Sequence, residues 1–207
     1  DLVTYLDADL WFLASPDSLI TSFRSSESDV LVTEHAYHPA FDQSSTYGYF
    51  CVQFLTARRS SSEDIIGRWK NQCLEGCFAW PENGRFGDQG YLNEWPQKYG
   101  QRVLIPEKKE TFQGPWNALR FPYGEAMAYH FHSFLFFGAG KYDSGPYPIP
   151  EPHIRNLYAR YTEALCEAES QIQATGFEPG GREGFRARAY SRIKRLVRLC
   201  RPKITLG

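Results

Sequence analysis

Short apolar runs alternate with longer amphipathic stretches along most of this chain. The apolar runs predict strands at residues 2–6, 29–33, 49–57, 102–105 and 126–131. The amphipathic stretches carry apolar residues at helical spacing, which predicts helices at residues 15–25, 61–77, 88–95 and 153–174. Strands that alternate with helices in this way predict a layered α/β fold, in which helices flank a mixed sheet.

Local signals set the expected ends of these helices. Ser15 followed by Pro16 is typical of a helix start, because a capping residue precedes a proline at the first helical position. Asp88 opens a short helix that should stop before Pro96, since the residue before a proline disfavours helical geometry. The helix at 61–77 is expected to bury one stripe, which comprises Ile65, Ile66, Trp69, Cys73 and Cys77.

The first residues, 2–6, form a mostly apolar run that predicts a buried strand. A buried strand needs a neighbour on each side, and nothing before this run could supply one. We therefore expect further sequence upstream of Asp1.

Length and composition suit one domain with a substantial core and a small appendage. The chain has 207 residues, of which 42% are hydrophobic and 16% are aromatic. Its net charge of −1 gives no global field that would attract nucleic acid, so no nucleic-acid partner is expected.

The strongest local charge lies near the carboxyl terminus. Nine Lys or Arg residues and one acidic residue lie between Arg182 and Lys203, after a Gly-rich linker at 176–184. Residues 185–200 form a predicted basic amphipathic helix with a narrow apolar stripe. Such a helix can lie on an anionic membrane surface, remain solvated, or pack against an acidic face, and the sequence leaves these alternatives open.

The cysteines indicate a reducing environment. Their number, five, is odd, and no second Cys/His pair stands at zinc spacing, which favours reduced thiols over disulfides or a zinc site. No apolar run reaches the roughly 18 residues of a membrane span. These features predict a cytoplasmic protein, for which the basic tail offers a peripheral contact with the inner face of the membrane.

Asp7 and Asp9 follow the first predicted strand directly. Residues i and i+2 of a strand face the same side, so both carboxylates can reach one divalent cation at the strand end. Carboxylate oxygens suit Mg²⁺ or Mn²⁺, whose remaining coordination positions a diphosphate can fill. A solvated turn or a helix cap is the alternative interpretation of the same pair.

Three further positions combine polar groups in ways that suit a binding site. His130 and His132 would share one face at a strand end, where neutral imidazole can join the carboxylates on a metal. Asp88 and Gln89 open a helix after a Gly-rich loop, and segment 115–117 places an indole beside an amide. The corresponding alternatives are core histidines, a helix cap and packing under a loop.

Together these segments resemble a known family of enzymes. YLDADLWFLASPDSL, ENGRFGDQGYLNEWP, PWN and HFHSF occur here in the order found in bacterial glycosyltransferases of the GT-A nucleotide-diphospho-sugar transferase fold. The similarity is to a group related to the retaining family of glycogenin and lipopolysaccharide galactosyltransferases, and it covers residues 1–137. The resemblance implies a GT-A-like mixed sheet whose nucleotide-binding βαβ segment would precede Asp1. It also implies a catalytic region at 1–148, a helical extension at 149–175 and a linker with a tail helix at 176–207.

The resemblance also implies a role for each candidate residue. Asp7 and Asp9 would bind the donor diphosphate and Mn²⁺ (or Mg²⁺), and His130 would complete the metal site. His132 is a further candidate for donor binding. Asp88 and Gln89 would contact the transferred sugar. The donor or acceptor pocket would be lined by Trp116 and Asn117.

The function expected from this resemblance is transfer of a hexose from a nucleotide diphosphate sugar, with UDP as the expected nucleotide, to a glycan or lipid-linked acceptor. Retention of the anomeric configuration would proceed by front-side displacement, since no residue stands out as a nucleophile. One alternative is a phosphatase of the haloacid dehalogenase type, although Leu10 and Trp11 replace the residues that normally follow its acid pair. The other is a catalytically inactive module that binds sugar or nucleotide.

Overall fold

The computed structural model describes residues 1–81 and 85–177. The chain divides into two compact units, of which the first is Asp1–Phe131 and the second begins at His132. The domain boundary expected at residue 148 therefore falls inside the second unit. The linker and basic helix predicted for residues 176–207 lie almost entirely outside the described residues.

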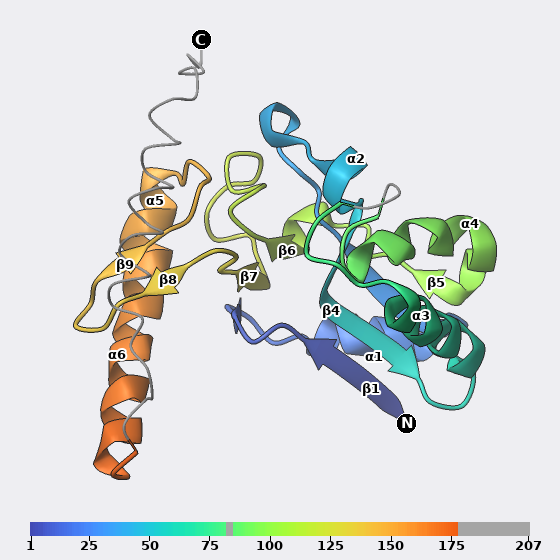
Figure 1. Ribbon diagram of the computed structural model, residues 1–207, viewed down its shortest axis with the longest axis horizontal. Coiled ribbons are helices and arrows are strands. Elements are labelled where there is room, and N and C mark those ends of the chain that lie inside the picture. The colour runs from blue at the N-terminus through green and yellow to red at the C-terminus, as the bar shows by residue number, and fades with distance from the viewer. Residues whose placement is uncertain (82–84, 178–207) are drawn as a thin grey trace. The chain divides into compact units, whose positions relative to one another are not determined.

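A four-stranded mixed sheet forms the centre of the first unit (Figure 1). Its strands are β1 (Leu2–Leu6), β4 (Phe50–Arg58), β3 (Val30–Glu34) and β5 (Val103–Leu104), in that spatial order. β1 and β3 run antiparallel to β4, whereas β5 runs parallel to β3. The predicted mixed α/β character of the chain is thus confirmed at this level.

Residues of β3 alternate between two hydrophobic clusters, one on each face of this sheet. Val30 and Val32 are fully buried in a cluster with Ile65, whereas Leu31 is fully buried in a second cluster with Phe23. This alternation follows from the two-residue period of a strand. Both faces of the sheet are therefore covered at β3.

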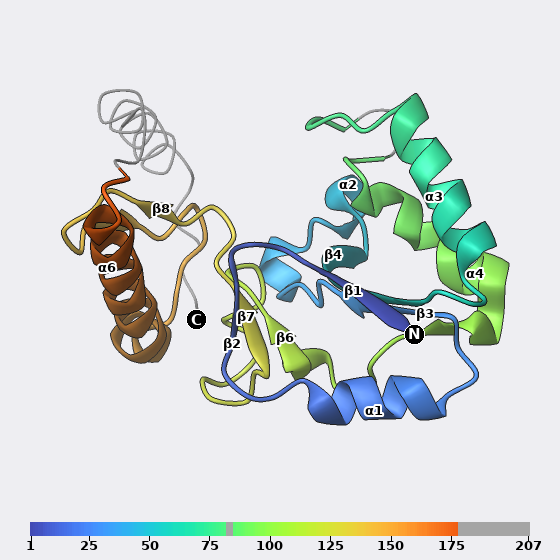
Figure 2. The ribbon, with the colours of Figure 1, turned by 90° about the horizontal axis from the view of Figure 1, so that it is seen from below.

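Helices supply the apolar side chains that cover these faces. α1 (Asp17–Ser25) packs on one face, and α3 (Glu63–Glu75) packs on the other together with η2 (Gln89–Glu94) and α4 (Trp95–Tyr99). Figure 2 shows α1 and α3 on opposite sides of the sheet. α1 begins one residue later than predicted, with Pro16 and not Ser15 at the capping position, although the Ser15 hydroxyl accepts a hydrogen bond from the amide of Asp17 at 3.2 Å.

A second, smaller sheet completes the first unit. It orders β2 (Leu10–Phe12), β7 (Ala128–His130) and β6 (Phe112–Gln113), with β2 antiparallel and β6 parallel to β7. The sequence did not predict β2 or β6, because strands of three and two residues show no alternation. Short helical turns join the remaining elements: η1 (Pro39–Phe41), α2 (Ser44–Tyr47), η3 (Gly100–Arg102) and η4 (Lys109–Thr111).

The expectation that residues 2–6 form a buried strand is wrong. In the described part of the chain β1 pairs only with β4, so it lies at the edge of the sheet. Its apolar side chains are therefore exposed to solvent, with Val3 61%, Tyr5 49% and Leu6 43% exposed. An apolar run predicts a strand, but burial depends on neighbours that the run does not specify.

Two predicted helix ends also differ from the structure. The helix that follows Asp88 does not stop before Pro96, because the 3₁₀ turn η2 leads into α4 and the proline occupies the first turn of α4. Proline is tolerated there, since the amide it lacks would have no partner within the helix. α3 ends at Glu75, so Cys77 is exposed beyond the helix and does not extend its buried stripe.

The second unit combines a hairpin with a long helix. The hairpin pairs β8 (Leu135–Phe136) with β9 (Tyr142–Asp143). The helix runs through α5 (Glu151–His153), the π-helical turn η5 (Ile154–Tyr158) and α6 (Ala159–Ala174), which confirms the helix predicted for residues 153–174. Among the described residues, no helix combines the length and the apolar character that crossing a membrane requires.

Candidate metal and active site

The acid pair lies in the connection between the two sheets of the first unit. β1 ends at Leu6, and Asp7–Ala8–Asp9 leads directly into β2 of the smaller sheet. The amide of Asp7 donates to the carbonyl of Gln53 at 3.1 Å, which extends the pairing of β1 with β4 by one step. The amide of Leu10 donates back to the carbonyl of Asp7 at 3.2 Å. The backbone of the acid pair is therefore fixed at the carboxyl end of β1.

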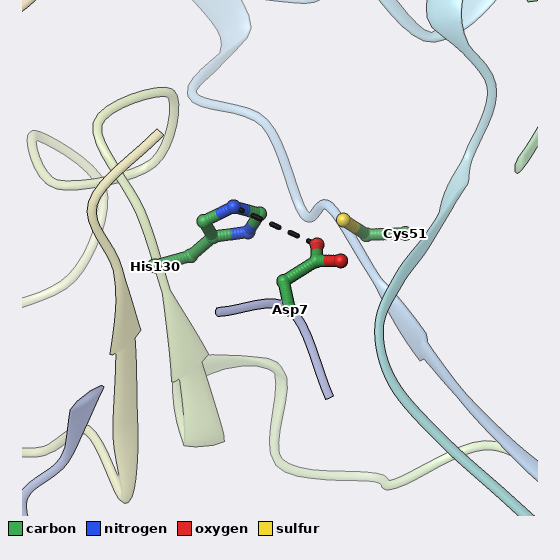
Figure 3. Close-up of side chains that lie close together, drawn as sticks. All are labelled: Asp7, Cys51 and His130. Atoms are coloured by element: carbon green, nitrogen blue, oxygen red, sulfur yellow. Dashed lines mark ion pairs between the residues drawn. The ribbon is translucent and has the colours of Figure 1, made fainter. Parts of the chain in front are cut away.

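Strand register brings His130 to the acid pair, although they are far apart in sequence. β2 and β7 pair with Leu10 opposite His130, and the amide of Phe131 donates to the carbonyl of Asp9 at 2.9 Å. The Nε2 atom of His130 consequently lies 3.0 Å from Oδ1 of Asp9 and 3.7 Å from Oδ2 of Asp7. Figure 3 shows His130 and Asp7 facing each other. The structure thus brings together the three residues predicted to bind a metal.

Tyr5 orients the carboxylate of Asp7. Its hydroxyl donates to Oδ1 of Asp7 at 2.8 Å, which leaves Oδ2 as the oxygen nearer to His130. This hydrogen bond, together with partial burial and the negative charge of Asp7, raises the pKa of Tyr5 to about 12. Sequence reasoning did not identify Tyr5, although its place two residues before Asp7 on one strand face was a usable signal.

The imidazole of His130 is buried and held on two sides. Its Nδ1 atom lies 3.1 Å from Oε1 of Gln53, and its ring meets the indole of Trp116 edge-on with centroids 5.3 Å apart. His130 is only 6% exposed, and Gln53 is fully buried. Gln53 was not predicted as a site residue, because a lone glutamine in an apolar strand carries no motif.

Cys51 is a second unpredicted neighbour of the acid pair. Its sulfur, a carboxylate oxygen of Asp7 and a ring nitrogen of His130 all lie within 4.8 Å of one another (Figure 3). The thiol is buried, and this burial, with the negative charge of Asp7 among the smaller contributions, raises its pKa well above the ordinary cysteine value. Cys51 and Gln53 stand two apart on β4, so both can face the same site.

The donor set at this site fits a hard divalent cation. Two carboxylates and one imidazole are ligands that Mn²⁺ and Mg²⁺ accept, whereas a protonated thiol is a poor ligand for either. The side chain of Asp9 is 43% exposed, compared with 21% for Asp7 and 8% for His130. The site therefore opens to solvent on the side of Asp9, where further oxygen ligands have access.

Asp88 lies within electrostatic reach of the acid pair. Burial raises its pKa, the backbone amides of Asp88 and Gln89 oppose this by hydrogen bonding, and the charge of Asp7 adds to the increase. The indole of Trp69 donates to the carbonyl of Asp88 at 3.0 Å, and Nε2 of Gln89 donates to the carbonyl of Tyr47 at 2.8 Å. Asp88 is thus a half-buried carboxyl group on which the charge of Asp7 acts, whereas the Gln89 amide anchors the end of α2.

Trp116 and Asn117 are packed beneath the loop that follows β3. Trp116 is 3% exposed and Asn117 is fully buried, and both donate to the carbonyl of His35, at 2.7 and 2.9 Å. The Asn117 oxygen also accepts from the amide of Gly114 at 2.9 Å. The structure therefore gives both residues the packing role that the sequence left open, and a direct contact with the donor or acceptor stays a prediction.

His132 does not share a strand face with His130. β7 ends at His130, and His132 is an exposed residue in the turn that begins the second unit. The strand that was expected at residues 126–131 is shorter, and the chain turns after it at His132 and Ser133, where Ser133 adopts a left-handed conformation with φ of 61°. A role for His132 in donor binding stays a prediction.

Comparisons with known proteins give little functional information. No protein-family model matches the chain. It is 31% identical over 97 residues to the uncharacterized protein YfnF of Bacillus subtilis strain 168, a match that spans 44% of this chain and only 32% of that protein. The crystal structure of mouse xyloside xylosyltransferase 1 in its apo form aligns with a TM-score of 0.38 and 12% identity, over 64% of this chain and 58% of that chain. A likeness this weak carries no argument, so function must be argued from the site.

Proposed function

We propose that this chain forms the metal- and diphosphate-binding part of a glycosyltransferase. The enzyme would transfer a hexose from a nucleotide diphosphate sugar, with a UDP-linked donor as the first candidate, to a glycan or lipid-linked acceptor. The observation that carries the proposal is the position of His130 Nε2, 3.0 Å from Asp9 and 3.7 Å from Asp7. Retention of the anomeric configuration belongs to the proposal through the sequence resemblance.

Electrostatics supports a cation at this site. Asp7 and Asp9 converge on one imidazole, and the charge of Asp7 also acts on Asp88. A diphosphate would be repelled by these carboxylates unless a cation lay between them. Asp7, Asp9 and His130 would hold Mn²⁺ or Mg²⁺, which when bound supplies positive charge against the charge that develops on a departing diphosphate.

The neighbouring residues have roles that need no metal. Asp88 is half-buried and would accept hydrogen bonds from hydroxyl groups of the transferred sugar. Gln89 keeps Asp88 in place through its bond to Tyr47 and can also meet the sugar if that bond opens. Trp116 and Asn117 support the 35–38 loop, which would form part of the pocket wall.

The basic segment between residues 182 and 203 bears on the proposed acceptor. A lipid-linked acceptor would lie at a membrane surface, and the basic residues between 182 and 203 would bring the chain there by attraction to anionic lipid. This segment lies outside the described residues. Peripheral contact with the inner face of the membrane is accordingly a proposal drawn from charge alone.

Direct measurement of cation binding tests the proposal first. Electron paramagnetic resonance would follow Mn²⁺ binding by the native chain, and calorimetry would then follow UDP binding with and without Mn²⁺. Asp9→Asn should abolish both signals, whereas Asp17→Asn, which changes an exposed aspartate of α1, should change neither. Mn²⁺ binding that is absent from the native chain, or equal in the Asp9→Asn variant, would contradict the metal site.

A second set of measurements tests the reaction. A panel of nucleotide diphosphate sugars should be hydrolysed or used for transfer only when Mn²⁺ or Mg²⁺ is present. A phosphoaspartate formed on Asp7 with a phosphate ester as substrate would instead favour the phosphatase alternative, and failure of phosphate mimics to bind there would count against it. Normal cation binding without transfer or hydrolysis would favour the inactive binding module.

A further inference from the structure

A chain of buried hydrogen bonds leads from the backbone of β4 to His130. The Thr33 hydroxyl donates to the carbonyl of Cys51 at 3.4 Å, and the amide nitrogen of Gln53 donates to the Thr33 hydroxyl at 3.3 Å. The other end of the Gln53 side chain, Oε1, lies 3.1 Å from Nδ1 of His130. All of these side chains are buried, with Thr33 2%, Gln53 0% and His130 6% exposed.

The direction of this chain follows from its first member. The carbonyl of Cys51 can only accept, so the single hydroxyl proton of Thr33 is used there. Thr33 must then accept from Gln53, which turns the amide nitrogen of Gln53 toward Thr33 and its oxygen toward His130. An oxygen at that position requires the Nδ1 atom of His130 to carry a proton. In a neutral imidazole, Nε2 is then left with the lone pair, which the carboxylates of Asp7 and Asp9 favour only when a cation lies between them.

We infer that Gln53 is a positioning residue for the cation site, because it fixes His130 in the tautomer whose Nε2 atom can bind a metal. This inference rests on the proposed function and extends it to a residue that would not touch the cation. Metal-binding histidines usually donate their second ring nitrogen to an acceptor in this way, which sets the tautomer and the ring orientation.

Gln53 acts on both halves of the site. Its backbone carbonyl accepts from the amide of Asp7 at 3.1 Å, and its side chain holds His130. A substitution at position 53 leaves the backbone contact in place and removes the side-chain contacts with His130 and Thr33. The two functions of the residue can therefore be separated by mutation.

Gln53→Met tests the inference, since methionine has a similar length and offers no strong acceptor to Nδ1. Gln113→Met is the matched control, because Gln113 is a second buried glutamine on a strand of the first unit, 1% exposed, whose amide donates to Pro122 instead. Proton–nitrogen correlation NMR on the full chain at alkaline pH, with and without Mg²⁺, reports the tautomer of each neutral histidine. His130→Asn identifies the His130 signals among those of the five histidines.

We expect the native chain and Gln113→Met to hold the His130 proton on Nδ1. In Gln53→Met the proton should move to Nε2 or divide between the two nitrogens. Mn²⁺ affinity should fall about 10–100-fold in Gln53→Met, the usual cost of losing such a supporting partner, and should be unchanged in Gln113→Met. A proton on Nε2 and none on Nδ1 in the native chain with Mg²⁺ present, or an unchanged tautomer and Mn²⁺ affinity in Gln53→Met, would overturn the inference.

Thr33→Val provides an independent test if Gln53→Met does not fold. It removes the hydroxyl that orients the Gln53 amide and should cause smaller changes of the same kind in the tautomer and in Mn²⁺ affinity. An unchanged tautomer and an unchanged affinity would count against the chain of hydrogen bonds.

Failure of the proposed function would give a different result. A native chain that binds no Mn²⁺ would have no cation site, and Gln53 would then have no cation site to position. Mn²⁺ binding that depends on Asp9 but not on Gln53 would overturn the role of Gln53 alone.

Discussion

The indole of Trp116 meets the imidazole of His130 edge-on, with ring centroids 5.3 Å apart. The indole is itself fixed, because its Nε1 atom donates to the carbonyl of His35 at 2.7 Å. Trp116 therefore joins the loop after β3 to the histidine of the candidate metal site. A change that moves the indole should be felt both in stability and at the site.

Gly114→Ala should produce such a change. A Cβ atom at Gly114 would lie 2.8 Å from the Cη2 and Cζ2 atoms of Trp116, closer than ordinary packing allows. Displacing the buried indole should cost about 1–3 kcal/mol of unfolding free energy, the usual range for overpacking, and should weaken Mn²⁺ binding. Urea denaturation measures the first effect and Mn²⁺ titration the second.

Gly67→Ala is the control for this experiment. Gly67 lies in α3, and a Cβ atom there would meet nothing within 4 Å. Alanine should raise stability by about 0.5–1 kcal/mol through helix propensity and leave Mn²⁺ binding unchanged. Equal stability changes in the Gly114 and Gly67 variants would show that the indole does not occupy the position described.

Mn²⁺ should stabilise the native chain against heat, and a chelator should reverse the effect. A ligand that binds only the folded state adds about 2.7 kcal/mol at a concentration one hundred times its dissociation constant. His130→Asn should reduce this stabilisation severely, because one of the three proposed ligands is lost, whereas His38→Asn, in the loop after β3, should retain it. Calorimetric melting curves with Mn²⁺ and with chelator measure the difference, and an unchanged shift in His130→Asn would exclude His130 as a ligand.

The larger strands and the residues of the site were predictable for different reasons. β1, β3 and β4 lie within a residue or so of the predicted strands, since each is an apolar run long enough to stand out. Asp7 and Asp9 could be identified because both are acidic and directly follow such a run. Their meeting with His130 could be expected only from the resemblance, since it depends on β2, a strand of three residues.

Gln53 and Cys51 could not have been identified from the sequence. Each is a single polar or sulfur-containing residue within the apolar strand β4, and its proximity to the site depends on cross-strand register. Register is a non-local property, because it depends on how separate segments pair. The exposure of β1 was mispredicted for a related reason, since burial is set by neighbouring strands.

Asp29 makes the stability of the first unit depend on pH. Burial alone would raise its pKa, but hydrogen bonds from Ser61 and Arg102, with the charge of Arg102, outweigh this and lower it. A carboxylate with a lowered folded-state pKa stabilises the fold above its unfolded value, near 3.9, and this contribution is lost as the pH falls through the folded pKa. Arg102→Met should therefore lower stability at neutral pH and flatten its decline in acid, with a further share from Asp64, whose pKa the same guanidinium lowers by hydrogen bonding.

Urea denaturation between neutral and acidic pH measures this dependence. Arg24→Met is the control, since it removes the same charge from an exposed position in the last turn of α1. It should leave the shape of the acid decline unchanged. If the unfolding free energies of the native chain and Arg102→Met fall in parallel as the pH is lowered, Arg102 does not lower the pKa of Asp29.

Arg58, which lies on the strand β4, caps the carboxyl end of α1. Its guanidinium donates to the carbonyls of Phe23, Arg24, Ser26 and Ser28 at 2.7–2.9 Å, at and just beyond the last turn of the helix, where carbonyls have few partners within the helix. Arg58→Met should lower the unfolding free energy by about 2–3 kcal/mol, because charged hydrogen bonds are lost and part-buried carbonyls remain unsatisfied.

Lysine should not replace Arg58, because one ammonium group cannot reproduce the planar fork that reaches all of these carbonyls. Arg58→Lys is therefore expected to lose most of the stability that Arg58→Met loses. Arg59→Met, which alters the exposed adjacent residue, should change the unfolding free energy by less than about 0.5 kcal/mol. Denaturation of the three variants in urea compares them directly, and full stability in Arg58→Lys would mean that positive charge alone, acting on the helix dipole, closes the helix end.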